Sequence, residues 1–176
     1  MKTLRRFFIG AILVLAVSAA FSQARVQFIH NSADEALSVV DIWIDQKMVA
    51  EDFHFRSSTP FIDATAGQQI TVSVVAPDSP GPENPLWSGT YTLNNAETYL
   101  FVADGILSGT GYDPAPPFGM QLYTGAREQA AMSDQTDVLF HHGSTDAPAL
   151  DIFETGIGLG QWVNDLAYTS FDGYIE

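Results

Sequence analysis

The sequence contains no cysteine. This absence excludes disulfide bonds, a thiol nucleophile, thiolate metal ligands and a lipid-modified N-terminal cysteine. A domain without disulfides must be held together by its hydrophobic core, and about 100 residues suffice to bury one.

Long apolar runs are also absent, apart from one near the N-terminus. A basic head within the first six residues precedes this run, 7–17, and small residues follow it. The order is typical of a secretory signal peptide, and the run is too short to span a bilayer, which needs about 20 residues. We therefore expect residues 1–24 to be a signal peptide, cleaved after Ser22 or after Ala24, and a protein that is secreted to the cell envelope or the extracellular space.

Positive charge is scarce. The leader carries three of the seven basic residues and none of the 21 acidic ones, so the mature chain has four basic and 21 acidic residues and a net charge of −17. Nucleic acid and anionic membranes would repel such a chain, so we expect no nucleic-acid binding and no membrane insertion after signal removal. Because 46% of the residues are hydrophobic, the chain is not a disordered acidic tail. The partners left are an extracellular glycan or an extracellular protein.

Two stretches of the chain are similar to each other. Residues 26–34, "VQFIHNSAD", and residues 138–146, "VLFHHGSTD", agree at five of nine positions, where chance gives roughly one match. Further similar pairs follow at nearly the same spacing: "VVDIWID" with "ALDIFET", and "DFHFRSSTPFID" with "DLAYTSFDGYIE". We therefore predict two copies of one unit.

This similarity gives the expected domain organisation. A first copy covers 25–127, a linker covers 128–136, and a second copy covers 137–176. The second copy lacks the counterpart of residues 64–127. Because an incomplete sandwich has unpaired strand edges and is prone to aggregation, we expect the second copy to be truncated and the sequence to be a fragment.

Alternating apolar and polar residues predict short strands, with no helix beyond a single turn at 126–132. In the first copy the predicted strands are 25–30, 39–45, 48–50, 59–62, 69–75, 86–93, 98–103 and 120–124. Two proline-rich stretches, 76–85 and 112–119, predict loops, because proline cannot donate a hydrogen bond to a sheet. The pattern predicts an all-β fold: an immunoglobulin-like antiparallel β-sandwich, with a small β-barrel as the alternative.

The same stretches resemble a known family. "ARVQFIHNSADEALSVVDIWID" and, more weakly, "TDVLFHHGSTDAPALDIFE" are similar to the opening of the secreted bacterial domain-of-unknown-function family DUF4397, whose pattern is ARV, a few residues, then HxSxDAPxVDVYV. "FRSSTPFIDATAGQQITVSV" and "LNNAETYLFVADG" are similar to the strands that follow in this family. The resemblance implies a tandemly repeated, β-sandwich-like envelope or extracellular domain. It implies no activity, because the family has no established one.

Each copy carries a histidine, a serine and two aspartates, which are residue types that also build hydrolase sites. They are His30, Ser32, Asp34 and Asp41 in the first copy, and His142, Ser144, Asp146 and Asp151 in the second. Alternation places each histidine on the apolar face at the rim of the core, where a hydrogen bond to a backbone carbonyl or a carboxylate is expected. Serine and aspartate after a strand cap turns, and neither serine lies in a GxSxG elbow. We predict structural roles, with a hydrolase as the least favoured alternative.

Metal binding is a second use for these groups. The candidate calcium ligands are Asp34, Glu35, Asp41, Asp146 and Asp151, although no DxDxDG loop is present. The pair His141-His142 lacks a third zinc ligand at a recognisable spacing, and His141 is expected to be exposed. We predict no cofactor, with calcium as the alternative.

Trp43 is a candidate ligand platform. Ile42 and Ile44 are expected on the core face of their strand, which turns Trp43 outward between Asp41 and Asp45. An exposed indole flanked by carboxylates suits stacking against a sugar ring. The alternative is that Trp43 packs against a neighbouring strand or the other copy.

These observations favour a non-catalytic secreted or cell-surface module, used as a spacer or for binding in a tandem array. The second hypothesis is a lectin-like module that binds carbohydrate or calcium. Its sugar-binding version requires an exposed Trp43.

Overall fold

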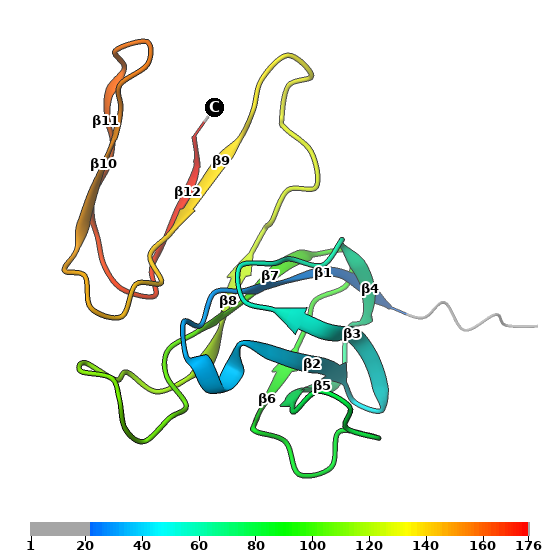
Figure 1. Ribbon diagram of the computed structural model, residues 1–176. Helices are drawn as coiled ribbons and strands as arrows, with labels where there is room; N and C mark the ends of the chain where they lie inside the picture. The colour runs from blue at the N-terminus through cyan, green and yellow to red at the C-terminus, as the bar shows by residue number, and fades with distance from the viewer. Residues whose placement is uncertain (1–21, 176) are drawn as a thin grey trace, which may run out of the picture.

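Residues 22–175 are described by the computed structural model, and they form twelve β-strands and one turn of 3-10 helix (Figure 1). Most of the predicted signal peptide lies outside this part of the chain. In chain order the elements are β1 Gln23–His30, η1 Glu35–Leu37, β2 Val39–Ile44, β3 Lys47–His54, β4 Ile62–Thr65, β5 Gln69–Val75, β6 Trp87–Thr92, β7 Thr98–Asp104, β8 Gly119–Thr124, β9 Val138–His141, β10 Leu150–Glu154, β11 Gly160–Leu166 and β12 Phe171–Ile175.

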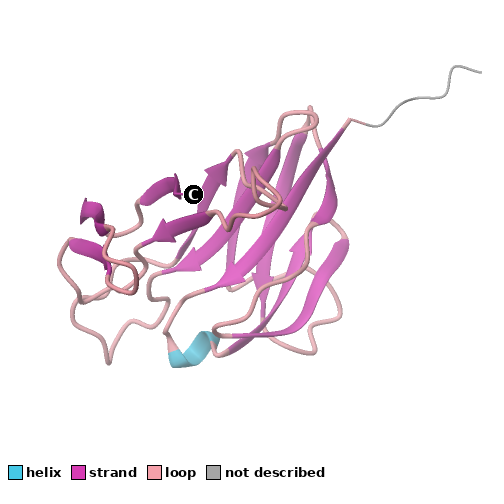
Figure 2. Cartoon of the chain, turned by 90° about the horizontal axis from the view of Figure 1, so that it is seen from above, coloured by secondary structure: helices cyan, strands magenta, loops and turns pink. Residues whose placement is uncertain are grey.

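The first eight strands form a β-sandwich. One sheet has the order β4-β1-β7-β8 and the other the order β3-β2-β5-β6, and the two face each other in Figure 2. Neither sheet closes on itself. The predicted sandwich is therefore confirmed, and the small barrel is wrong.

The first strand departs from the expected antiparallel pattern. β1 pairs antiparallel with β4 on one side but parallel with β7 on the other, with Arg25 opposite Thr98 and His30 opposite Ala103. Parallel strands run in the same direction, so the chain leaves β1 and β7 at the same end of the sheet. This arrangement brings residues 31–34 close to residues 105–108.

Alternating side chains of both sheets fill the core. On β1 the inward residues are Ala24, Val26, Phe28 and His30, all fully buried. The Phe28 ring stacks on Phe101 of β7, with centroids 5.1 Å apart. Burying a side chain of this size stabilises the fold by about 1.5–3 kcal/mol, so the β1–β7 contact is a main source of stability.

The fourth strand begins later than predicted. The stretch 59–62 was expected to be a strand, whereas β4 begins at Ile62. Before β4 the chain is already paired with β1. Ser58 forms an isolated bridge with Ile29, and Thr59 exchanges two hydrogen bonds with the backbone of Phe28, one through its N–H and one through its hydroxyl oxygen. Pro60 has no N–H to donate, which interrupts a regular ladder at this point.

Two other expectations differ from the structure. β3 is longer than the predicted 48–50 and reaches His54. The expected helical turn at 126–132 is wrong, because this stretch contains only bends and loop. The helical turn of the described chain is η1 instead, and Asp34 caps it by accepting a hydrogen bond from the backbone N–H of Ala36.

The last four strands form two small sheets, β12-β9 and β10-β11, that lie beside the sandwich (Figure 1). Leu139 and Phe171 from β9 and β12 pack on a buried cluster formed by Leu100, Val102 and Ala126. The C-terminal strands thereby cover part of the outer face of the sheet β4-β1-β7-β8, around β7.

Candidate functional site

His30, the first of the predicted signature residues, ends β1 inside the core. Its Nε2 lies 2.7 Å from the carbonyl oxygen of Leu37, and its ring faces Phe53 and Phe55. Nδ1 is buried and has no hydrogen-bond partner among the described residues. Burial lowers the pKa of His30, although the hydrogen bond to Leu37 acts in the opposite direction. The ring is therefore neutral, with its proton on Nε2.

Ser32 and Asp34 bind the loop that follows β7. The Ser32 hydroxyl donates to the carbonyl oxygen of Gly105 at 2.6 Å. Asp34 Oδ2 accepts from the backbone N–H groups of Leu107 and Ser108 at 2.8 and 2.6 Å, and Oδ1 accepts from the Ser108 hydroxyl at 2.7 Å. We call this set of contacts the loop clamp. Asp34 is only 1% exposed, so its negative charge is balanced by these donors rather than by water.

The clamp also fixes the ionisation of Asp34 and the identity of Gly105. Burial alone would raise the pKa of Asp34, but the hydrogen bonds from Ser108, Ala36 and Leu107 together outweigh it and hold the pKa below its usual value. Gly105 has a φ of 81°, and a Cβ there would lie 2.4 Å from the carbonyl oxygen of Pro117. Only glycine fits this turn.

These contacts do not make a hydrolase triad. The proton on His30 Nε2 faces a backbone carbonyl, and the Ser32 hydroxyl donates to another backbone carbonyl. A nucleophilic serine requires its hydroxyl to donate to the histidine. The side chains of this stretch instead satisfy backbone groups of the loops around them.

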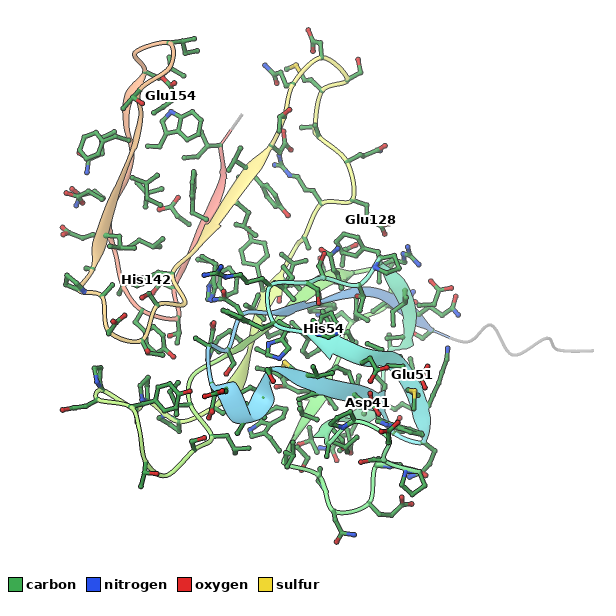
Figure 3. The ribbon with its side chains drawn as sticks, viewed as in Figure 1. Asp41, Glu51, His54, Glu128, His142 and Glu154 are labelled. Atoms are coloured by element: carbon green, nitrogen blue, oxygen red, sulfur yellow. The ribbon has the colours of Figure 1, made fainter. Side chains whose placement is uncertain are left out.

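A similar arrangement occurs around His142, which is labelled in Figure 3. Its ring is buried, Nε2 lies 2.9 Å from the carbonyl oxygen of Pro148, and Tyr168 contacts it edge-on at 6.1 Å. Phe55 contacts His30 in the same way at 6.0 Å. Phe55 and Tyr168 also occupy the same position in the two similar stretches 52–63 and 165–176.

Ser144 and Asp146 differ from Ser32 and Asp34, the residues with which the sequence alignment pairs them. Both are exposed, and the Ser144 hydroxyl donates to Asp146 Oδ1 at 2.9 Å. The described part of the chain has no loop against them that would correspond to residues 105–108. The same residue types therefore lie in a buried clamp at one place and on the surface at the other.

Asp41 and Asp151 share one structural role. Asp41 Oδ1 accepts from the backbone N–H of Asp52 at 2.8 Å, and Asp151 Oδ1 accepts from that of Asp165 at 2.9 Å. Asp52 and Asp165 both have positive φ, 48° and 54°, at an irregularity in the strand pairing. Each aspartate thus holds a β-bulge in place.

The acidic residues do not gather into a metal site. Within residues 22–175, no three histidine, aspartate or glutamate side chains lie close enough to hold a metal ion. The candidate calcium ligands Asp34 and Asp41 are used to bind backbone N–H groups. No observation of this part of the chain therefore favours calcium.

Trp43 is not the exposed platform that strand alternation suggested. It points away from the core, but it is only 9% exposed, and its Nε1 is buried without a partner among the described residues. Its neighbours on that face, Asp41, Ser73 and Val75, are buried as well. The centre of this sheet is covered on both faces, so the exposed platform is wrong and the alternative, packing of Trp43 within the fold, agrees with the structure.

His141 was expected to be exposed, and this expectation is also wrong. Its Nε2 lies 2.5 Å from Asp104 Oδ2, its Nδ1 lies 3.1 Å from the carbonyl oxygen of Ser170, and its ring packs on Phe171. Asn31 donates to the other oxygen of Asp104 at 2.8 Å. This contact between His141 and Asp104 joins the sandwich to the C-terminal strands and borders a cleft of about 410 Å³.

Sequence reasoning missed the contact between His141 and Asp104. The two residues are 37 positions apart and lie on different sheets, so no local pattern relates them. The one signal was that His141 stands where the first stretch has Ile29.

The loop clamp predicts a large difference between two matched substitutions. Asp34→Asn turns an amide group toward several buried donors, so we expect the free energy of unfolding to fall by about 2–4 kcal/mol. Asp146→Asn removes the same charge from an exposed position, and we expect a change within about 0.5 kcal/mol. Urea denaturation of both variants measures the two values. Equal losses would contradict a structural role that is specific to Asp34.

The buried neutral His30 predicts sensitivity to acid. The lowered pKa means that the unfolded chain binds a proton more readily than the folded chain. The contribution of His30 to the free energy of unfolding is therefore fully present above a pH of about 6.5, the ordinary histidine pKa. It is lost as the pH drops below this value, by at most about 1.4 kcal/mol per pH unit. Urea denaturation between pH 7.5 and 5 measures this slope.

The control for this slope is His30→Gln, which keeps a donor near the position of Nε2 but does not titrate. The other histidines contribute equally to both proteins, so the difference in slope belongs to His30. Identical slopes for the two proteins would contradict the assignment.

No helix within the described residues is long and apolar enough to cross a membrane. No curated protein and no solved structure matches the chain. The family model described as "Domain of unknown function (DUF4397)" matches residues 24–153, which is more than half of the chain and includes β1 to β10 almost completely. The chain therefore belongs to the DUF4397 family.

Proposed function

We propose that this protein is a non-catalytic module that acts outside the cytoplasm, in the cell envelope or the extracellular space, as a spacer or a binding module. The proposal rests on one observation: the side chains that could take part in catalysis bind groups of the surrounding loops instead. His30 and Ser32 contact backbone carbonyls, and Asp34 accepts from backbone N–H groups and the Ser108 hydroxyl. None of the three has its reactive group directed at an open cleft.

The start of β1 distinguishes the two expected cleavage positions. Ala24 is buried and pairs with Ala64 in the sheet. Cleavage after Ala24 would remove a buried residue from the sheet, whereas cleavage after Ser22 leaves β1 complete. We therefore favour Gln23 as the first residue of the mature protein.

We also propose that the chain contains two copies of one unit, the second represented by β9 to β12. Two registers support this proposal. In the sandwich, Val26 pairs with Ile62 and Ile29 bridges to Ser58. In the C-terminal strands, Val138 pairs with Ile175 and His141 pairs with Phe171. The sequence alignment matches each residue of the first register with the residue in the same place in the second register, so the two pairings are equivalent.

The charge of the mature chain limits its partners. A net charge of −17 disfavours nucleic acid and anionic membranes, which leaves neutral or basic partners. The burial of Trp43 removes the sugar-stacking platform that would have favoured a lectin. A protein partner is consequently the better-supported choice.

The proposal predicts a mature, exported protein without hydrolase activity. The chain with its leader is expressed in a bacterial host, and intact mass identifies the first residue of the exported protein. We expect Gln23. The purified protein is then incubated with chromogenic esters, glycosides and phosphates, beside a Ser144→Ala variant that removes the exposed serine. We expect no turnover above buffer from either protein.

Three results would overturn the proposal. Retention of the whole chain in the cytoplasm would contradict the localisation. Turnover by the parent protein that Ser144→Ala abolishes would contradict the absence of catalysis. Turnover that both proteins show equally would point to a different catalytic serine or residue and would also contradict it.

A further inference from the structure

The joint between the sandwich and the C-terminal strands contains a buried carboxylate, Asp104, at the end of β7. Asp104 is fully buried, and its two oxygens lie 2.5 Å from Nε2 of His141 and 2.8 Å from the side-chain nitrogen of Asn31. In the described part of the chain its one ion pair is the pair with His141. A buried carboxylate is costly unless a positive charge balances it, so the sandwich depends on His141 for this balance.

Both nitrogens of the His141 ring face acceptors. Nε2 faces the carboxylate of Asp104, and Nδ1 lies 3.1 Å from the carbonyl oxygen of Ser170. An ionised carboxylate and a carbonyl oxygen can only accept, whereas a neutral imidazole has one proton to donate. Both contacts are therefore hydrogen bonds only when the pair of His141 and Asp104 holds one additional proton.

The other two histidines that contact backbone carbonyls do not need this proton. His30 has an acceptor on Nε2 and no partner on Nδ1 among the described residues. His142 has an acceptor on Nε2, and its Nδ1 accepts from the backbone N–H of Ser144 at 3.3 Å. A neutral ring satisfies both arrangements, so the requirement for a second proton is particular to His141.

The end of β9 fits closely against the carboxylate. A Cβ on Gly143 would collide with the side chains of Asn31 and Asp104, so the absence of a side chain at this position allows the close approach. Phe171 packs on the ring of His141 with centroids 4.1 Å apart, and on Tyr123 of β8 with centroids 5.1 Å apart. Apolar contacts thus hold the C-terminal strands on the sandwich, and His141 adds a charge to them.

We propose that His141 and Asp104 form a pH-sensitive joint, in which the C-terminal strands dock on the sandwich with the uptake of one proton. An undocked histidine in water releases this proton as the pH passes about 6.5. Above that pH the docked state still holds it, so each further pH unit favours undocking by up to about tenfold. The effect ends when the docked pair also releases its proton. The joint is consequently strongest below a pH of about 6.5 and loosens in alkaline solution.

The other charged and titratable groups around the joint do not change charge over this range. They are Arg56, Arg127, Asp137, Tyr168, Asp172 and Tyr174. Arg127 pairs with Asp137 and holds the pKa of this carboxyl group below its usual value. Burial and the charge of Asp104 raise the pKa of Tyr168. Between a pH of about 6.5 and 9, arginine and aspartate stay ionised and tyrosine stays neutral, so histidine is the group that titrates.

The ring nitrogens of His141 test the proposal directly. The full chain is labelled with nitrogen-15, and its histidine rings are followed by NMR while the pH is raised. We expect His141 to keep both ring protons to a pH about one unit or more above the titration of His54, which is exposed. The contact between Tyr123 and Phe171 shows in the same sample that the strands are docked. A docked chain in which His141 titrates together with His54 would overturn the proposal.

Asp104→Asn is the matched change in the partner of His141. The amide has the same shape, its oxygen can still accept from Asn31, and its NH2 group then faces Nε2 of the ring. We expect His141 to be neutral at pH 7.5, with its single proton on Nδ1. Asp134→Asn makes the same change at an exposed loop residue and should leave the ring of His141 as in the parent. A ring that keeps both protons beside Asn at position 104 would contradict the proposal.

His141→Gln measures the consequence for docking. Glutamine can donate an N–H to Asp104 but does not titrate. Urea titration of the Phe171 ring signals gives the undocking constant at pH 6.5 and 8.5. We expect this constant to rise by roughly tenfold or more in the parent relative to His141→Gln, because the remaining histidines contribute equally to both proteins. His54→Gln should behave as the parent. The same pH dependence in the parent and in His141→Gln would rule out the joint.

Discussion

The arrangement of the sandwich depends on the hydrogen bonds between the carboxylate of Asp34 and the loop that follows β7. β1 and β7 are parallel, so the segments that follow them lie at the same end of the sheet. Asp34 from one segment binds two backbone N–H groups and a hydroxyl of the other. Because the carboxylate is buried, leaving those donors without it would cost more than a surface hydrogen bond contributes. A neighbouring contact, from Asn31 to Asp104, joins the same two ends.

Identical residue types have different roles at the two places where the signature occurs. His30 and His142 are both buried and contact a backbone carbonyl. Asp34 is buried in a clamp, whereas Asp146 is on the surface. The roles of the histidines depend on residues within the same short stretch, and so they recur. The role of the aspartate depends on a loop more than 70 residues away, and so it does not.

This distinction explains how much could be predicted from the sequence. Strand alternation located most of the first eight strands and the buried face of β1, because these depend on local pattern. Alternation also placed Trp43 correctly on the face opposite Ile42, but it contains no information on whether that face is covered by other parts of the chain. The partners of Asp34 and His141 could not be predicted for the same reason, since they come from distant loops and strands. The late start of β4 was in principle predictable, because Pro60 stands where the ladder fails.

The central claim is that the signature residues maintain the fold by holding the loop after β7. Amide hydrogen exchange of Leu107 and Ser108, read by NMR on the purified protein, tests it most directly. We predict that both amides exchange as slowly as that of Val102 within β7, because their N–H groups donate to a buried carboxylate. Exchange as fast as at Gly111, which lies exposed further along the same connection, would contradict the claim.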